Sequence, residues 1–155
     1  MDFETQPVNT THTTACDLAM EIARQFGRVR LRVSGMSMAP AVRPGDLLSV
    51  ERAAVDKIVP GEIVVFAREG RLIAHRAVGR TEGASGTCLI TRGDRARRND
   101  RPITGEELIG RVTGIERDGN PVPARTRLSR AQQALARLLR FSDHATCLYL
   151  RLAAL

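Results

Sequence analysis

Short apolar runs separated by turns fill the middle of the chain, and this pattern favours a β fold over a helical one. Residues 28–33 alternate strictly between arginine and an apolar side chain, as expected for a strand with one buried face. Farther along, runs rich in Val, Ile and Leu are separated by turn sequences at residues 44–46, 60–62 and 82–84, each of which contains Gly. We therefore predict that the chain is all β from about residue 28 to about residue 115.

A helix is predicted before this β region. It begins at Thr14, where Asp17 stands at the spacing of a capping box, and it ends at Gly27. The apolar face of this helix contains Leu18, Ile22 and Phe26. Residues 1–12 are polar and lack periodicity, so we expect them to form a flexible tail.

A basic amphipathic helix is predicted from Ser129 onward. Its apolar face contains Ala131, Leu135, Leu138 and Leu139, and its charged face contains Arg130, Arg137 and Arg140. Two interpretations stay open for it: packing on the β region, or peripheral contact with an anionic membrane surface, which the arginines would favour. Residues 147–155 are apolar but too short to span a bilayer, and they favour a second helix. The predicted parts are a tail (1–12), a β domain with its N-terminal helix (13–120) and a helical extension (121–155).

Length and composition favour one domain in a reducing compartment. A chain of 155 residues, 43% of them hydrophobic, can bury a core, and an aromatic content of 3% means that this core is aliphatic. Cys16, Cys88 and Cys147 are odd in number and far apart, unlike a disulfide framework or a metal site. We therefore expect a cytoplasmic protein, either free or membrane-associated, with no metal or organic cofactor. The formal net charge of +7 favours acidic partners, and the sequence specifies no oligomeric state.

Three separated segments contain the side chains of a serine hydrolase. Ser37 lies in a Ser-Met-Ala-Pro sequence, His75 lies in an apolar run, and Asp94 and Asp100 lie in a later loop. A serine hydroxyl is a weak nucleophile at neutral pH unless a base accepts its proton, and that base acts best when a third group fixes its orientation. Histidine suits this role because its unperturbed pKa is about 6.5. A serine-lysine pair would have to use Lys57, the sole lysine of the chain.

The surroundings of these residues resemble the sequence boxes of type I signal peptidases. The four similar segments are 34–46, 60–66, 73–79 and 91–101. In the first, Ser37 holds the position of the serine that attacks the peptide bond, and in the third, His75 holds the position of the general base. Bacterial leader peptidases usually have lysine at that position, whereas the archaeal and endoplasmic-reticulum branch has histidine. The last segment is similar to the Gly-Asp box of that branch.

The resemblance implies a mainly β fold, antiparallel and flanked by an N-terminal and a C-terminal helix. It also implies a serine endopeptidase that cuts a leader or small precursor peptide after small residues. Ser37 would be the nucleophile and His75 the general base. One of Asp94 and Asp100 would pair with the histidine, and the other would stabilise the loop or the developing positive charge.

Two further residues are candidates for binding the oxyanion or the substrate: Ser34 and Met38. The Ser34 hydroxyl could join the backbone N–H of Ser37 in holding the oxyanion, and a purely structural turn is the alternative. Five arginines surround the carboxylates: Arg92, Arg95, Arg97, Arg98 and Arg101. They form either a solvated loop or a positive collar that attracts an acidic peptide or a phosphate surface.

The sequence departs from the signal-peptidase pattern near its N-terminus. Members of that family are held in the membrane by one or two hydrophobic helices. The 36 residues before Ser37 contain no apolar run near the ~20 residues that a span requires. Asp17, Glu21 and Arg24 interrupt the best candidate. We therefore expect a chain without a transmembrane anchor. We expect its substrate to be a peptide or protein, whose identity the sequence does not specify.

Two other functions fit a similar β domain. One is a catalytically idle peptide-binding module that presents precursors to another enzyme. The other is a regulator related to the self-cleaving repressors, which carry a separate DNA-binding domain and a lysine base, and this sequence shows neither. We expect no specific nucleic-acid partner, because the basic charge lacks the aromatic side chains on which single strands stack.

Overall fold

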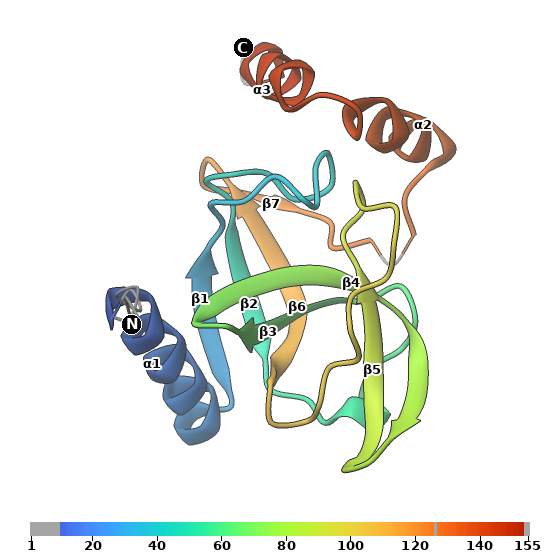
Figure 1. The fold of residues 1–155 in the computed structure, drawn as a ribbon. Helices are drawn as coiled ribbons and strands as arrows, with labels where there is room; N and C mark the ends of the chain where they lie inside the picture. The colour runs from blue at the N-terminus through green and yellow to red at the C-terminus, as the bar shows by residue number, and fades with distance from the viewer. Residues whose placement is uncertain (1–9, 126, 154–155) are drawn as a thin grey trace, which may run out of the picture.

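The computed structural model describes residues 10–125 and 127–153, and a single antiparallel sheet dominates this part of the chain (Figure 1). Its strands are β1 (Arg28–Arg32), β2 (Leu47–Glu51), β3 (Ile63–Arg68), β4 (Arg71–Gly83), β5 (Gly86–Arg92), β6 (Leu108–Arg117) and β7 (Asn120–Val122). Their order is β1-β2-β6-β3-β4-β5, and β7 pairs with β6. The prediction of a mainly β, antiparallel fold is confirmed.

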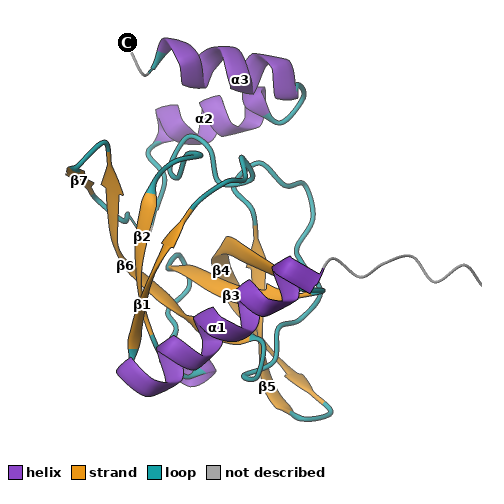
Figure 2. Ribbon diagram, turned by 90° about the vertical axis from the view of Figure 1, so that its left-hand side faces the viewer, coloured by secondary structure: helices purple, strands orange, loops and turns teal. Residues whose placement is uncertain are grey.

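Helix α1 (Thr10–Phe26) lies against the sheet near β1, as Figure 2 shows. It begins before the predicted start, so Thr14 lies inside the helix and the proposed capping box with Asp17 is wrong. The helix ends as predicted, and Gly27 adopts the left-handed backbone (φ 71°) that glycine tolerates at a helix C-terminus. Residues 1–9 of the predicted tail lie outside the described residues, and residues 10–12 belong to α1.

The buried face of α1 also differs from the prediction. The most buried side chains of α1 are the small ones at Cys16, Ala19 and Ala23, and the larger Met20 and Ile22 pack partly buried beside them. Of the three residues on the predicted apolar face, Ile22 packs against the core, whereas Leu18 and Phe26 are 58% and 70% exposed. The periodicity of the sequence identified an apolar face of α1, but it did not show which side chains of the helix pack against the sheet.

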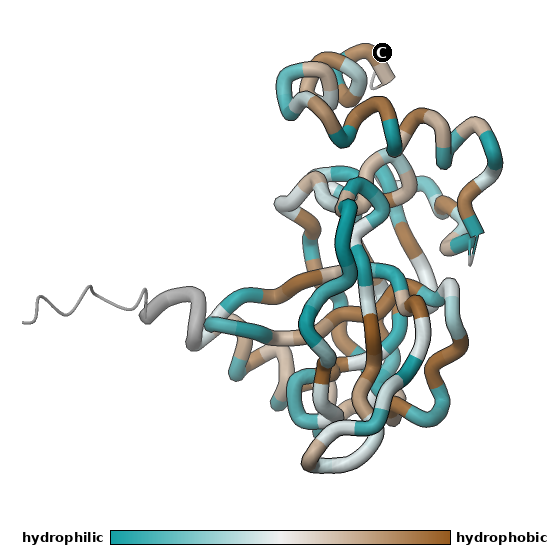
Figure 3. The backbone as a smooth tube through the Cα atoms, turned by 45° about the vertical axis from the view of Figure 1, so that its right-hand side comes forward, coloured by the Kyte–Doolittle hydropathy of each residue, from teal (hydrophilic) through white to brown (hydrophobic). Residues whose placement is uncertain are grey.

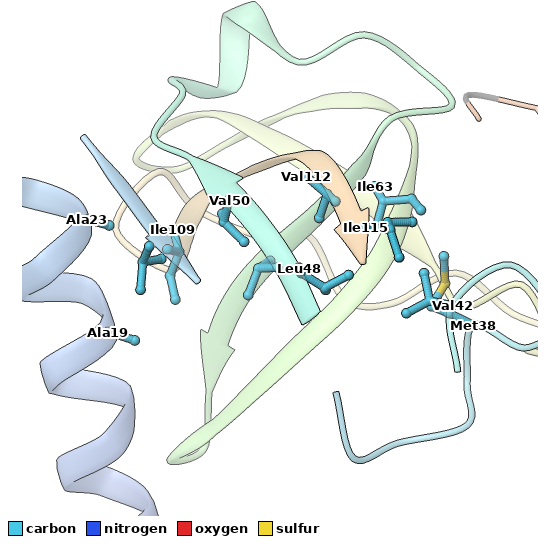
Figure 4. Packing of buried hydrophobic residues seen from close by; sticks show 12 residues of the cluster. Ala19, Ala23, Met38, Val42, Leu48, Val50, Ile63, Ile109, Val112 and Ile115 are labelled. Carbon is cyan, nitrogen blue, oxygen red and sulfur yellow. The ribbon is translucent and has the colours of Figure 1, made fainter. Parts of the chain in front are cut away.

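Two apolar clusters lie on the two faces of β3, which explains why this strand is a continuous apolar run. Ile63 and Val65 point into the cluster under α1, whereas Val64 and Phe66 point into the second one. Figure 4 shows the first cluster, whose labelled members are Ala19, Ala23, Met38, Val42, Leu48, Val50, Ile63, Ile109, Val112 and Ile115. This cluster is aliphatic apart from one methionine, as the composition predicts.

Two short helices, α2 (Arg130–Leu139) and α3 (Asp143–Leu152), form a hairpin beyond one end of the sheet (Figures 1 and 2). Helix α2 begins where predicted: Ser129 accepts from the backbone N–H of Gln132, and the Gln132 side chain accepts from the backbone N–H of Ser129. Ser142 caps α3 by accepting from Ala145 N–H. Within the described residues, no helix combines the length and the apolar character that crossing a bilayer demands.

Candidate active site

The structure brings Ser37, His75 and Asp100 into one hydrogen-bonded chain. His75 Nδ1 lies 2.6 Å from Asp100 Oδ2, and His75 Nε2 lies 3.1 Å from Ser37 Oγ. In the tautomer with its proton on Nδ1, the imidazole donates to the carboxylate and accepts from the serine hydroxyl. This is the geometry in which a histidine can remove a serine proton while a carboxylate holds the ring in place.

His75 is positioned by strand β4, which pairs with β3 on one side and with β5 on the other. It lies on β4 opposite Val64 of β3, where the strand pairing fixes its backbone. Its side chain is 13% exposed, and its ring meets the ring of Phe66 edge to face at a centroid distance of 6.0 Å. The imidazole therefore has one apolar wall and opens toward the serine.

Ser37 lies in the loop between β1 and β2, which a buried ion pair stabilises at its far end. Asp46 is 1% exposed and accepts two hydrogen bonds from Arg117, at 2.8 and 2.7 Å, and one from the backbone N–H of Arg43. The hydrogen bond to Asp46 is the main cause that raises the pKa of Arg117, against the effect of burial. Met38, next to the serine, is 2% exposed and packs in the core. These contacts restrict the serine loop on both sides of Ser37.

Asp100 is held by the strand that precedes its loop. Thr91 is fully buried, and its hydroxyl donates to Asp100 Oδ2 at 2.6 Å, while the Asp100 backbone N–H donates to the Thr91 carbonyl at 2.8 Å. Beyond Asp100, Arg68 of β3 donates to the carbonyls of Arg101 and Pro102 and binds both carboxylate oxygens of Glu107. The carboxylate that orients His75 is thus fixed from both sides.

Asp94, the other candidate partner of the histidine, has a different neighbour. It forms a two-pronged ion pair with Arg76, with both N···O distances at 2.9 Å, and its side chain is 4% exposed. Arg76 also donates to the carbonyls of Gly61 and Arg125. The structure therefore assigns the histidine to Asp100 and gives Asp94 a position in a structural network beside the site.

The serine and histidine lie in a cleft of about 550 Å³. The aliphatic residues along it include Leu31, Val33, Val42, Leu48, Val65, Leu72 and Ala74. Ser34 and Met38, the candidate oxyanion and substrate-binding residues, also line this cleft. The Met38 sulfur accepts the backbone N–H of Asp94 at 3.4 Å, which links the serine loop to the Asp94 loop.

Lys57, the alternative base, lies elsewhere. It ends a short 3₁₀ helix (Val55–Lys57), its side chain is 72% exposed, and its ammonium pairs with Asp56 at 3.5 Å. Lys57 is not among the residues that line the cleft. Cys16 does line the cleft, but burial is the main cause that raises the pKa of its thiol, so the reactive thiolate is disfavoured.

The arginines of the loop after β5 divide between several partners. The Arg95 side chain donates to the carbonyl of Leu139 and to Asp143 on the helical hairpin, and its backbone N–H donates to the Ser37 carbonyl at 3.0 Å. Arg97 lies over the ring of Phe141 at 4.9 Å. Arg95 and Arg97 therefore join the loop to the hairpin, a role that the spacing of the arginines along the chain did not indicate.

Comparisons with known proteins agree with this geometry. Residues 5–91, which include Ser37 and His75, match the family model described as "Peptidase S24-like". Over 90 residues, the chain is 37% identical to the signal peptidase complex catalytic subunit SEC11C of Homo sapiens, Mus musculus and Canis lupus familiaris. Each alignment covers 51% of this chain and 47% of the relative, so the chain spans about half the length of the curated relatives it matches. Because the family model matches more than half of the chain, this protein belongs to the Peptidase S24-like family and is related to the signal peptidase catalytic subunit.

Proposed function

We propose that this protein is a serine endopeptidase that cuts a leader or small precursor peptide after small residues. The observation that carries the proposal is the hydrogen-bonded series Ser37, His75 and Asp100 on the wall of an aliphatic cleft. Membership of a serine peptidase family supports the same chemistry. The similarity to a signal peptidase subunit favours a peptide substrate over a small ester.

The proposed reaction proceeds through an acyl-enzyme. His75 Nε2 takes the Ser37 proton while Ser37 Oγ attacks the scissile carbonyl, and Asp100 stabilises the imidazolium that forms. The imidazolium then gives the proton to the departing amine as the C–N bond breaks. In the second half of the reaction, a water molecule replaces the serine as the nucleophile. His75 removes a proton from this water, and the water oxygen attacks the ester carbonyl. The bond to Ser37 Oγ then breaks, and the proton returns from His75 to the serine oxygen.

In the proposed mechanism, two groups hold the oxyanion of the tetrahedral intermediate. They are the backbone N–H of Ser37 and the hydroxyl of Ser34, which lines the same cleft. Most side chains along the cleft are aliphatic, Arg32 and Arg71 are its arginines, and none of the described residues that line it is acidic, so it favours apolar residues of the peptide. A preference for small residues before the cut rests on the signal-peptidase resemblance.

A peptide library tests this proposal. The wild-type protein should release new termini after Ala, Gly or Ser, detected by mass spectrometry, and Ser37→Ala should release none. Ser85→Ala, a change in an exposed turn between β4 and β5, is the matched control and should cut like the wild type. Equal cleavage by Ser37→Ala would reject the mechanism. Peptide binding to the wild type without any cleavage would instead support the idle binding module.

A further inference from the structure

We propose that the outer surface of the α2–α3 hairpin docks on an anionic phospholipid bilayer. This outer surface is defined by four exposed apolar side chains and three exposed arginines: Leu138, Phe141, Leu148, Leu152, Arg130, Arg137 and Arg151. The inference stands on this surface alone and does not depend on the proposed peptidase activity.

The hairpin has some apolar side chains that are buried and four large ones that are exposed, and Arg97 lies over the ring of one of these four, Phe141, at 4.9 Å. Ala136, Leu139 and Thr146 are buried, and the Thr146 hydroxyl donates to the Leu139 carbonyl within the hairpin at 3.1 Å. The four outward apolar side chains are 68, 71, 59 and 62% exposed, in the order Leu138, Phe141, Leu148 and Leu152. Leu148 and Leu152 are one helical turn apart on α3, and Leu138 and Phe141 stand three residues apart around the end of α2.

Figure 3 shows apolar and polar segments alternating along this hairpin at one extremity of the molecule. Large apolar side chains gathered at an extremity favour a partner that removes them from water, at about 25 cal/mol per Å² of apolar area. A bilayer interface accepts such side chains while arginines bind the lipid phosphates.

Charge identifies an anionic bilayer as the occupant. Residues 130–153 contain four arginines and one carboxylate, Asp143, which is already paired with Arg95 at 2.9 Å. A second copy of this chain would bring arginines against arginines, which opposes self-association. The exposed apolar side chains on α1 are a poorer site for an anionic bilayer than those of the hairpin. Asp17 and Glu21 are exposed beside Leu18 and would repel anionic lipid.

Docking at the hairpin would also hold the cleft next to the bilayer. The hairpin contacts the serine loop directly: Arg43 donates to the Tyr149 hydroxyl at 3.1 Å, and Cys147 Sγ lies 3.8 Å from the sulfur of Met36, next to Ser37. Arg95 joins the hairpin to the loop after β5. A membrane-bound hairpin therefore places Ser37 within reach of a peptide segment at the lipid surface.

Vesicle flotation of the full chain tests the docking. We expect the wild type to float with vesicles of 30% phosphatidylglycerol in phosphatidylcholine, and to stay behind with phosphatidylcholine alone. The apolar variant Leu138→Ser/Phe141→Ser/Leu148→Ser should reduce the partition coefficient by roughly tenfold or more, because binding scales with buried apolar area. The charge variant Arg130→Gln/Arg137→Gln/Arg151→Gln should also reduce the partition coefficient, and the partition coefficient of this variant should depend less on salt concentration than that of the wild type.

The matched control is Leu18→Ser/Phe26→Ser on α1, which removes similarly exposed apolar side chains from a surface that also carries Asp17 and Glu21, and it should float like the wild type. Thermal melts show whether each variant is folded, and all substituted side chains are exposed. Three results would overturn the proposal: no flotation of the wild type at low salt, equal loss in the α1 control, or full binding by both hairpin variants. A dimer in sedimentation equilibrium that the apolar substitutions dissociate, without vesicle binding, would assign the surface to a second copy.

Discussion

Gly93 lies against His75 so closely that a β-carbon at residue 93 would stand 3.0 Å from Nε2, the atom that faces Ser37. The same β-carbon would lie 3.2 Å from the Ser37 carbonyl oxygen. Both contacts are tighter than a β-carbon ordinarily makes, so a side chain at residue 93 requires the base or the nucleophile loop to shift by a few tenths of an ångström.

Gly93→Ala should therefore displace the imidazole and reduce peptide cleavage by about tenfold to a hundredfold, because small misplacements of reacting groups are costly. The reduction should appear in kcat in an assay with the library-selected peptide. Gly105→Ala is the matched control, since its β-carbon would meet nothing closer than Val55 Cγ2 at 3.9 Å. Unchanged kcat in Gly93→Ala, with the protein folded, would show that the ring is free to move aside.

The two aspartates should separate into two roles. Asp100→Asn leaves His75 without its carboxylate and should reduce kcat by about a thousandfold or more, with the fold retained. Asp94→Ala leaves the half-buried Arg76 without its ion-pair partner and should lower the free energy of unfolding by about 3 kcal/mol in urea titrations. The assignment would be wrong if Asp94→Ala kept full stability and Asp100→Asn kept full activity.

Thr91 should act as a positioning residue for Asp100. Thr91→Val keeps the shape of this buried side chain but removes the hydroxyl that donates to Asp100 Oδ2 at 2.6 Å. We expect kcat to fall roughly tenfold with little change in KM, because the peptide-binding cleft is not altered. Thr91→Ser, which restores the hydroxyl, should recover most of the rate. If the serine variant is as slow as the valine variant, packing rather than the hydrogen bond explains the effect.

Glu107 should make the stability of the protein depend on acid pH. The pKa of this carboxyl lies below its ordinary value of 4.5, mainly because Arg68 hydrogen-bonds to it, against the opposing effect of burial. A lowered folded-state pKa means that the unfolded chain takes up the proton first as pH falls. The stabilisation is therefore complete above the ordinary pKa and is lost as pH falls through the folded-state pKa.

Urea titrations between pH 6 and pH 3 measure this contribution. Glu107→Gln should lower stability at pH 6 and should flatten the loss of stability below pH 4.5 relative to the wild type. Glu116→Gln, in the exposed pair with Arg30, is the control and should change stability by less than about 1 kcal/mol. Parallel pH profiles for the wild type and Glu107→Gln would contradict the prediction.

The sequence predicted those features that local patterns encode. Alternation at residues 28–33 located β1, and Ser129 with Gln132 located the start of α2, because strand periodicity and helix capping are decided by neighbouring residues. The order of the serine, histidine and aspartate boxes located the site, because each box keeps its functional residue in a short segment.

Features decided by long-range packing were not predicted. The sequence does not distinguish Asp94 from Asp100 as the partner of the histidine. The fold shows that Asp94 forms an ion pair with Arg76, one residue after the histidine, and that Asp100 forms the hydrogen bond with His75. The apolar face predicted for α1 contains Leu18, Ile22 and Phe26, but the side chains of α1 in the core cluster are Ala19 and Ala23, with Ile22 packed against them. Thr91 and Gly93 gave no separate signal, because their roles depend on atoms that come from other loops.

Trapping the acyl-enzyme tests the central claim, that His75 makes Ser37 a nucleophile. The protein is mixed with an alanyl-peptide p-nitrophenyl ester and quenched in acid, and tandem mass spectrometry locates the acyl group. We predict acylation on Ser37 in the wild type and a loss of about a thousandfold in its rate in His75→Gln. Acylation on another residue, or Ser37 acylation at the same rate in His75→Gln, would contradict the account.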